Sequence, residues 1–283
     1  MVQGNIIEIG FLNVVASPHP DGIYAKSLIT VANTPVNLRG RDYAIITPPK
    51  AVPRQDGLHE GVISVWTDID SSEPSIEKAT FKQVDVEAAL KKVFAERGFN
   101  NRSFVYVLDE QTHTVGVELR NDLGKTLSIR QAGKLFEHLL STLNKDGQTF
   151  DVTILPEEDA LANVLGLERI DKIVIVLKRP NPGDHHGTDA EEILRELHEQ
   201  NMKRAEYIFS RQPGTDGIHL NEENQTKAEV ASSNGYVEST GMDEDDERSK
   251  RSTQEYPRII RRILAAGTTF GAVVATELRR FRG

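Results

Sequence analysis

The chain has 283 residues, of which 38% are hydrophobic and 27% are charged, a balance typical of a folded globular protein rather than a disordered one. It contains no cysteine, so disulfides, thiol nucleophiles and cysteine-ligated zinc sites are excluded. The first residues lack a basic leader, which favours a cytoplasmic protein over a secreted one.

The net charge of −9 is distributed unevenly along the chain. Residues 183–256 carry 8 basic side chains against 18 acidic ones, whereas residues 257–283 carry six arginines and one glutamate. This asymmetry indicates either that the two regions contact each other or that the basic end contacts an anionic partner. Two solvated faces are the simplest interpretation.

The first hundred residues combine strands with short helices. Residues 6–15, 42–47 and 61–68 predict strands, because each is rich in apolar residues and bounded by proline or glycine turns. Residues 24–32 predict a short helix. After Asp85, apolar side chains recur every three or four positions up to Phe94, which predicts an amphipathic helix.

The middle of the chain predicts the order strand, strand, helix, strand, helix, strand. Residues 104–108 and 115–119 flank a polar linker, as in a β-hairpin. Ser128 and Gln131 have the spacing of a capping box, which predicts the start of a helix. Residues 170–178 contain five consecutive apolar positions, which indicates a central strand covered on both faces.

The last hundred residues predict two further helices around a small hairpin. The spacing of apolar residues predicts one helix over residues 189–208 and another over residues 257–283. Between them, a strand over residues 236–240 and the acidic turn at residues 243–247 predict a hairpin.

These elements predict an α+β fold with mixed sheets and packed helices, in a split β-α-β or ferredoxin-like arrangement, plus a C-terminal amphipathic helix. We expect four segments. They are an N-terminal α+β half (1–100), a central α+β half around strand 170–178 (101–210), an acidic loop and hairpin (211–256), and the arginine-flanked helix (257–283).

The C-terminal helix carries the predicted binding residues. Its ends carry the arginines Arg258, Arg261, Arg262, Arg279, Arg280 and Arg282. Its oligomer or packing face consists of Ile260, Ile263, Gly267, Phe270, Gly271, Val274 and Leu278. Three interpretations stay open: the apolar face packs onto its own domain or a second copy, the arginines contact nucleic-acid phosphates, or the helix lies on a membrane.

Two groups of residues are weak candidates for a metal site. Asp184, His185 and His186 follow the central strand, and Asp68 and Asp70 lie at another strand end. Solvated surface positions are the favoured interpretation of both groups. The sequence contains no glycine-rich phosphate loop, so no cofactor is predicted, and a divalent metal is expected only for a nuclease.

Five short motifs resemble an uncharacterised bacterial family, the domain of unknown function numbered four-seven-four-seven, over roughly residues 5–256. They are RPNPGD at 179–184, EQN at 199–201, SNGYV at 233–237, DED at 243–245 and RST at 251–253. The resemblance implies a bacterial cytosolic protein of mobile-element or phage-defence gene sets, without assigned catalytic residues. Asp246 stands where the acidic turn of that family commonly ends in glycine, and the C-terminal helix is expected to be an addition to it.

The leading functional hypothesis is a non-enzymatic protein that binds nucleic acid or a protein partner through the C-terminal helix. Formation of a homo-oligomer through the same helix is the related alternative. A metal-dependent nuclease that uses the candidate metal residues is the enzyme alternative. A membrane-acting effector is the third, and the 14 uncharged residues 263–276 are shorter than the roughly 20 that a span needs.

Overall fold

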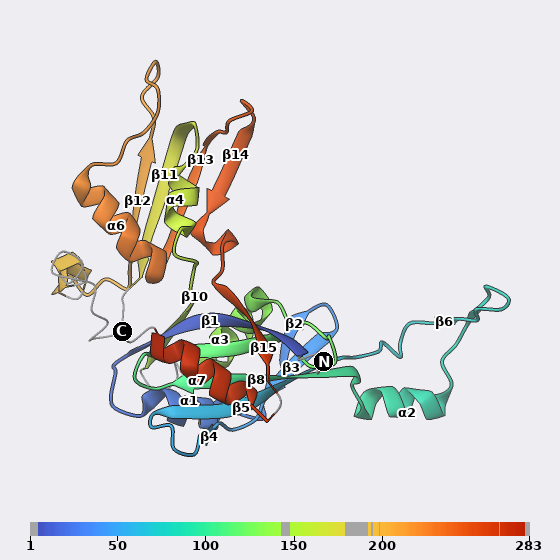
Figure 1. Cartoon of the computed structure of the whole chain (residues 1–283). Helices are drawn as coiled ribbons and strands as arrows, with labels where there is room; N and C mark the ends of the chain where they lie inside the picture. The colour runs from blue at the N-terminus through green and yellow to red at the C-terminus, as the bar shows by residue number, and fades with distance from the viewer. Residues whose placement is uncertain are drawn as a thin grey trace.

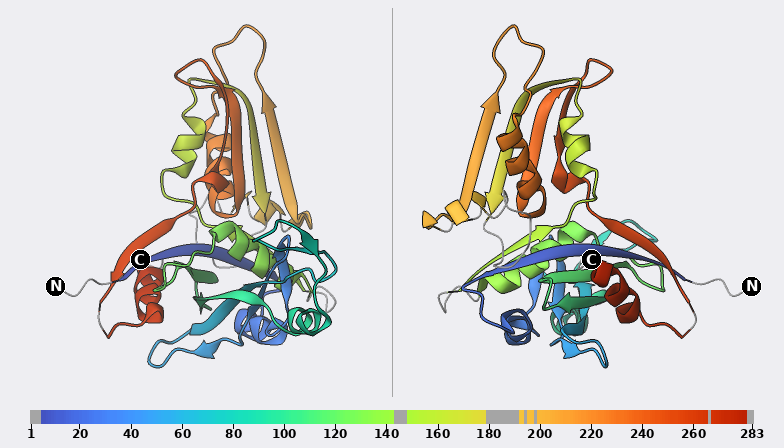
Figure 2. Two further views of the ribbon diagram at one scale, coloured as in Figure 1. Left: turned by 90° about the vertical axis from the view of Figure 1, so that its right-hand side faces the viewer. Right: turned by 60° about the vertical axis from the view of Figure 1, so that its left-hand side comes forward.

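A computed structural model describes residues 5–142, 148–178, 192–193, 195–197, 199–265 and 267–280. These residues form an α+β fold with two larger antiparallel sheets, each packed against helices (Figure 1). The predicted fold class is therefore confirmed. Figure 2 shows the smaller sheet standing on the larger one.

The larger sheet has nine strands in the order β10-β1-β9-β8-β5-β3-β2, with β15 paired to β1 and β4 paired to β5. Its strands are β1 (Asn5–Ser17), β2 (Val36–Arg39), β3 (Asp42–Ile46), β4 (Lys50–Ala51), β5 (Leu58–Thr67), β8 (Phe99–Asp109), β9 (Thr114–Arg120), β10 (Thr149–Ile154) and β15 (Ile259–Leu264). The predicted hairpin of residues 104–119 is confirmed as β8 and β9.

Helices cover both faces of this sheet. On one face, α1 (Ile23–Val31) and α3 (Ile129–Ser141) pack on a core that includes Leu12 and Val14. On the other, α7 (Phe270–Arg280) packs on Ile7, Ile9 and Phe11. Successive side chains of β1 point to opposite faces of the sheet, so this one strand contributes side chains to both cores. The capping box predicted at the start of α3 is present.

The smaller sheet has the order β12-β11-β13-β14. Its elements are β11 (Arg169–Lys178), β12 (Arg204–Ser210), β13 (Gly235–Met242), β14 (Arg248–Ser252), α4 (Ala160–Leu165), α6 (Glu222–Ser233) and the 3-10 turn η2 (Thr253–Glu255). β12 and β13 both run antiparallel to β11. They are therefore parallel to each other, and α6 connects them across β11, as in the predicted split β-α-β arrangement.

β11 is the predicted central strand, with a neighbour on each side. Ile173, Ile175 and Leu177 are fully buried in the core beneath the helices. Val174, which points to the opposite face, is half-buried, so that face of the sheet is covered less than the sequence indicates.

The helix predicted over residues 189–208 is wrong at its C-terminal end, because residues 204–210 form β12. Ala205, Tyr207 and Phe209 contact the core, whereas Glu206 and Ile208 point away from it. This period of two suits a strand, and pairing along β11 stabilises it.

The single helix predicted over residues 257–283 is also wrong. Its first part is the strand β15, which pairs with β1 so that Glu8 lies opposite Arg261. Its second part is α7, and Gly267, with a φ of 82°, lies in the connection between them. The short sequence IIRRIL fits a helical and an alternating pattern alike, and its β-branched isoleucines favour the strand.

The second sheet is inserted between two neighbouring strands of the first. The chain leaves the large sheet after β10 and returns to it at β15, and Pro156 and Pro257 form an isolated bridge where the two connections meet. The predicted boundary at residue 100 falls within the β5–β8 pair, and the boundary at residue 210 falls within one shared core.

Residues 69–98 form an arm between β5 and β8. It contains the short strands β6 (Ser75–Ile76) and β7 (Gln83–Val84), followed by α2 (Ala88–Glu96). No residue of the arm is buried. Figure 1 shows β6 and α2 held away from both sheets.

Candidate partner-binding surface

The described C-terminal arginines already have partners in their own chain. The ion pairs are Arg258 Nη2 with Glu158 Oε1 (3.5 Å), Arg261 Nε with Glu8 Oε1 (3.2 Å), Arg262 Nε with Glu277 Oε1 (2.8 Å) and Arg280 Nη1 with Glu277 Oε2 (3.0 Å). Arg279 donates a hydrogen bond to Gln55, and Arg282 lies outside the described residues. Much of the basic charge predicted to meet an external anion is therefore compensated locally.

Glu277 is the most enclosed member of these ion pairs. Its side chain is 4% exposed and accepts contacts from Arg262 on β15 and Arg280 on its own helix. A buried carboxylate needs such partners, because leaving it uncompensated costs several kcal/mol. The pair of Arg262 and Glu277 therefore attaches α7 to β15, while Arg280 compensates the same carboxylate from within the helix.

The apolar face of α7 is buried within its own chain. Phe270, Val274 and Leu278 join the core formed with β1 and β8. Gly271 and Gly116 allow the close approach, since a Cβ on Gly116 would lie 2.4 Å from Val274 Cγ1. Of the three interpretations of this helix, packing onto its own domain is the one that the structure shows.

The membrane interpretation fits α7 poorly, because the sheet covers its apolar side. Among the residues that the structure describes, no helix is both long enough and apolar enough to cross a bilayer.

β15 differs from α7 because it leaves apolar side chains exposed. Ile263 is 70% exposed and lies opposite Ile6 on β1, which is 57% exposed. Ile259 and Arg261 share this face, since they alternate with Ile260 and Arg262 along the strand. Ile260 is half-buried against α7, and Gly267 is exposed in the following connection.

The outer edge of β15 has no strand beside it in the described part of the chain, where β15 pairs with β1 alone. An unpaired edge presents backbone N–H and C=O groups to which another extended segment can add. We call this edge, together with Ile6, Ile259, Arg261 and Ile263, the β15 surface.

The structure describes only two of the five candidate metal residues, Asp68 and Asp70. Asp184, His185 and His186 lie outside the described residues. Asp68 accepts a hydrogen bond from the Trp66 indole at 2.9 Å, and Asp70 accepts one from the backbone of Ser72 and pairs with Arg41. Within the described ranges, no three histidine, aspartate or glutamate side chains are placed to hold a metal ion.

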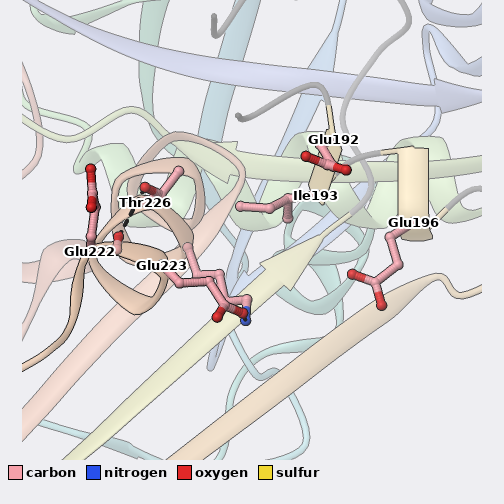
Figure 3. A pocket seen from close by; sticks show the side chains of 7 residues that line it. Glu192, Ile193, Glu196, Glu222, Glu223 and Thr226 are labelled. Carbon is pink, nitrogen blue, oxygen red and sulfur yellow. Dashed lines mark hydrogen bonds and ion pairs between the residues drawn. The ribbon is translucent and has the colours of Figure 1, made fainter. Parts of the chain in front are cut away.

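An acidic cleft of about 470 Å³ lies beside the second sheet. Figure 3 shows its two walls, with Glu192, Ile193 and Glu196 on one side and Glu222, Glu223 and Thr226 of α6 on the other. Lys227 completes the lining and forms an ion pair with Glu223. The hydrogen bond that Lys227 donates to Glu223 lowers the pKa of that glutamate. The lysine thus balances one of the four glutamates that line the cleft.

The arm carries an unusual amount of exposed apolar surface. Half of the exposed large apolar side chains in the described chain belong to it, namely Ile69, Ile76, Phe81, Val84, Leu90 and Val93. The amphipathic pattern after Asp85 does identify α2, but its apolar stripe contacts no core. Sequence periodicity signals such a stripe and cannot tell what covers it.

Glu118 on β9 is a buried acid that the sequence does not single out. Its Oε2 accepts a hydrogen bond from the backbone N–H of Val105 at 2.8 Å. Burial is the main cause that raises the pKa of Glu118 to about 7, and nearby Asp122 raises it further. This carboxyl changes its charge near neutral pH.

A family model described as Domain of unknown function (DUF4747) matches residues 5–278. The match continues beyond residue 256 and includes β15 and all of α7 except its last two residues. The expectation that the C-terminal segment is an addition to the family is therefore wrong. No curated protein matches the chain.

Proposed function

The chain belongs to the DUF4747 family, and from that premise we propose that it is a non-enzymatic binding protein that captures an extended protein segment at the β15 surface. The observation that carries this proposal is the open edge of β15, which lies beside exposed isoleucines and a largely exposed arginine.

The chemistry of the β15 surface selects the kind of segment. A strand that adds to an open edge gains main-chain hydrogen bonds, and its side chains supply the specificity. Ile6, Ile259 and Ile263 favour apolar side chains. Arg261, the arginine of this surface, is 76% exposed, so a segment that alternates acidic and apolar residues fits best.

A protein partner is favoured over a nucleic acid. Glu8, Glu158 and Glu277 already pair with four of the arginines that would contact phosphates. Binding to nucleic acid draws its affinity mainly from neutralised phosphates. The exposed isoleucines contribute nothing to such contacts, whereas they match an apolar peptide side chain.

A peptide array tests this proposal. It contains ten-residue peptides of three kinds: acidic with apolar, basic with apolar, and acidic with polar residues. We expect the whole protein to retain only the first kind, and Ile263→Asp to abolish that retention. Ile208→Asp is the matched control, because Ile208 is an exposed isoleucine on the edge strand β12. Equal retention by wild type and Ile263→Asp would reject the proposal.

Electrophoretic mobility shifts with DNA and RNA test the nucleic-acid alternative. Removal of residues 257–283 is unsuitable, because it would uncover the core under α7. Arg261→Glu with Arg279→Glu keeps that core intact. A shift that the wild type produces and this variant loses would favour nucleic acid instead of a protein segment.

The phage-defence or mobile-element context stays a prediction of the family resemblance. Plaque counts on host cells with and without the gene test it, and equal counts would contradict it.

A further inference from the structure

We propose that the segment captured by the β15 surface is the arm of a second copy of this chain, so that two copies exchange their arms. This inference rests on the proposed function and adds the identity of the partner.

The first argument is that the arm has no core of its own. Ile76 and Phe81 are 60% and 79% exposed, and none of the nine residues of α2 is buried. Isolated helices shorter than about 12 residues are marginal in water, because nucleation is costly and few hydrogen bonds follow it. The arm therefore gains stability from a surface outside its own chain.

The arm and the β15 surface carry complementary charge. Within the arm, residues 69–77, IDSSEPSIE, carry three acidic side chains and no basic one, and Asp70 among them pairs with Arg41 of its own chain. The β15 stretch 257–264 carries three arginines and no acidic side chain, and Arg261 is the arginine on the exposed face of the strand. Arg261 is 76% exposed despite its contact with Glu8, so it is accessible to a further carboxylate. Such complementarity favours this pairing over the pairing of two basic β15 edges.

Both segments also expose isoleucines. Ile69 and Ile76 are exposed within the acidic stretch, and Ile259 and Ile263 are exposed on β15. Their burial against one another would remove much of the exposed apolar surface of both segments from water.

Exchange also produces a closed assembly. Each copy donates one arm and accepts one, so a two-fold axis satisfies both surfaces at once. If only one copy bound the arm of the other, every oligomer would keep one unbound arm and one unpaired β15 edge. A dimer is therefore the expected state.

Removal of the arm tests the inference. Thr67 of β5 pairs directly with Phe99 of β8. An Asn-Gly turn can therefore replace residues 68–98 between them. Sedimentation equilibrium is expected to show a dimer for the wild type and a monomer for this variant, whose thermal unfolding stays cooperative and no longer depends on protein concentration. A wild-type monomer, or a dimer that persists without the arm, would overturn the inference.

Substitutions that reverse the charges of the arm and of β15 test the inference without a deletion. We expect Glu73→Lys with Glu77→Lys to raise the dimer dissociation constant about tenfold, and Arg261→Glu to raise it several-fold. The combination of all three is expected to recover most of the loss. Glu244→Lys and Arg248→Glu, at the turn between β13 and β14, serve as controls and should change nothing. A combined variant weaker than either parent would also contradict the exchange.

The peptide array separates this inference from the proposed function. Retention of acidic-apolar peptides by a protein that sediments as a monomer would mean that β15 captures a different chain, and the arm exchange would fall alone. If the protein retained no peptide and also sedimented as a monomer, the proposed function would be rejected as well.

Discussion

Arg262 Nε on β15 lies 2.8 Å from Glu277 Oε1 on α7, and the side chain of Glu277 is almost completely buried. This contact holds the helix and the edge strand together as one unit. The part of β15 that faces α7 is therefore structural, while its opposite face and its outer edge remain available.

This division predicts unequal effects for neighbouring arginines. Arg262→Met leaves Glu277 with Arg280 alone and is expected to lower the free energy of unfolding by about 2 to 3 kcal/mol. Arg261→Met removes an exposed pair and should cost less than about 1 kcal/mol. Urea unfolding of the two variants checks the difference. Equal losses would contradict the assignment of Arg262 to the structure.

A second prediction concerns the glycine beneath α7. Gly116→Ala would place a Cβ 2.4 Å from Val274 Cγ1. We expect it to lower the free energy of unfolding by about 1 to 3 kcal/mol, because this part of the core has no room for the methyl group. In the double variant with Val274→Ala, the loss should be smaller than the sum of the two single losses. Additive losses would show that the two residues are not coupled.

A third prediction follows from the raised pKa of Glu118. Its pKa is about 7 in the folded protein against a usual 4.5, so between these values the folded state binds the proton more tightly than the unfolded chain does. The stability contributed by this proton is fully present below pH 4.5 and is lost as the pH rises through 7.

Glu118→Gln removes this titration. Relative to wild type, the variant is expected to gain up to about 3 kcal/mol in the free energy of unfolding as the pH rises through that window. Thermal unfolding at pH 5 and pH 8 measures the change, with the exposed Glu96→Gln on α2 as control. A constant difference between variant and wild type at the two pH values would show that Glu118 does not titrate in this range.

Sequence reasoning succeeds where local contacts decide the structure. The Ser128 and Gln131 capping box, the β8–β9 hairpin and the apolar run of β11 are each specified by residues close together in the chain. The acidic turn is another local case. Asp246 adopts a φ of 58°, a left-handed conformation that glycine adopts most readily and that aspartate tolerates.

The same reasoning fails where distant segments decide. β15 is a strand because β1, more than two hundred residues earlier, offers it an edge, and a six-residue window cannot reveal that pairing. β12 becomes a strand beside β11 for the same reason. The amphipathic pattern of α2 is real, but periodicity does not disclose that its apolar side faces solvent.

The candidate site shows the same limit. The sequence locates the basic C-terminal segment, but it assigns the arginines and the apolar stripe to one continuous helix. The structure separates them, because Phe270, Val274 and Leu278 pack inward while Ile259 and Ile263 remain exposed on β15. The acidic carboxylates that compensate the arginines come from β1, from residue 158 and from α7, so only the fold reveals them.

Hydrogen–deuterium exchange of the β15 backbone tests the central claim most directly. The arm-deleted variant, in which no arm competes for the edge, is compared alone and with a saturating acidic-apolar decapeptide such as DIDSSEPSIE. Capture at the open edge predicts slower exchange of amides within residues 259–264 and no change in β12. Unchanged exchange in β15, or protection confined to other strands, would contradict it.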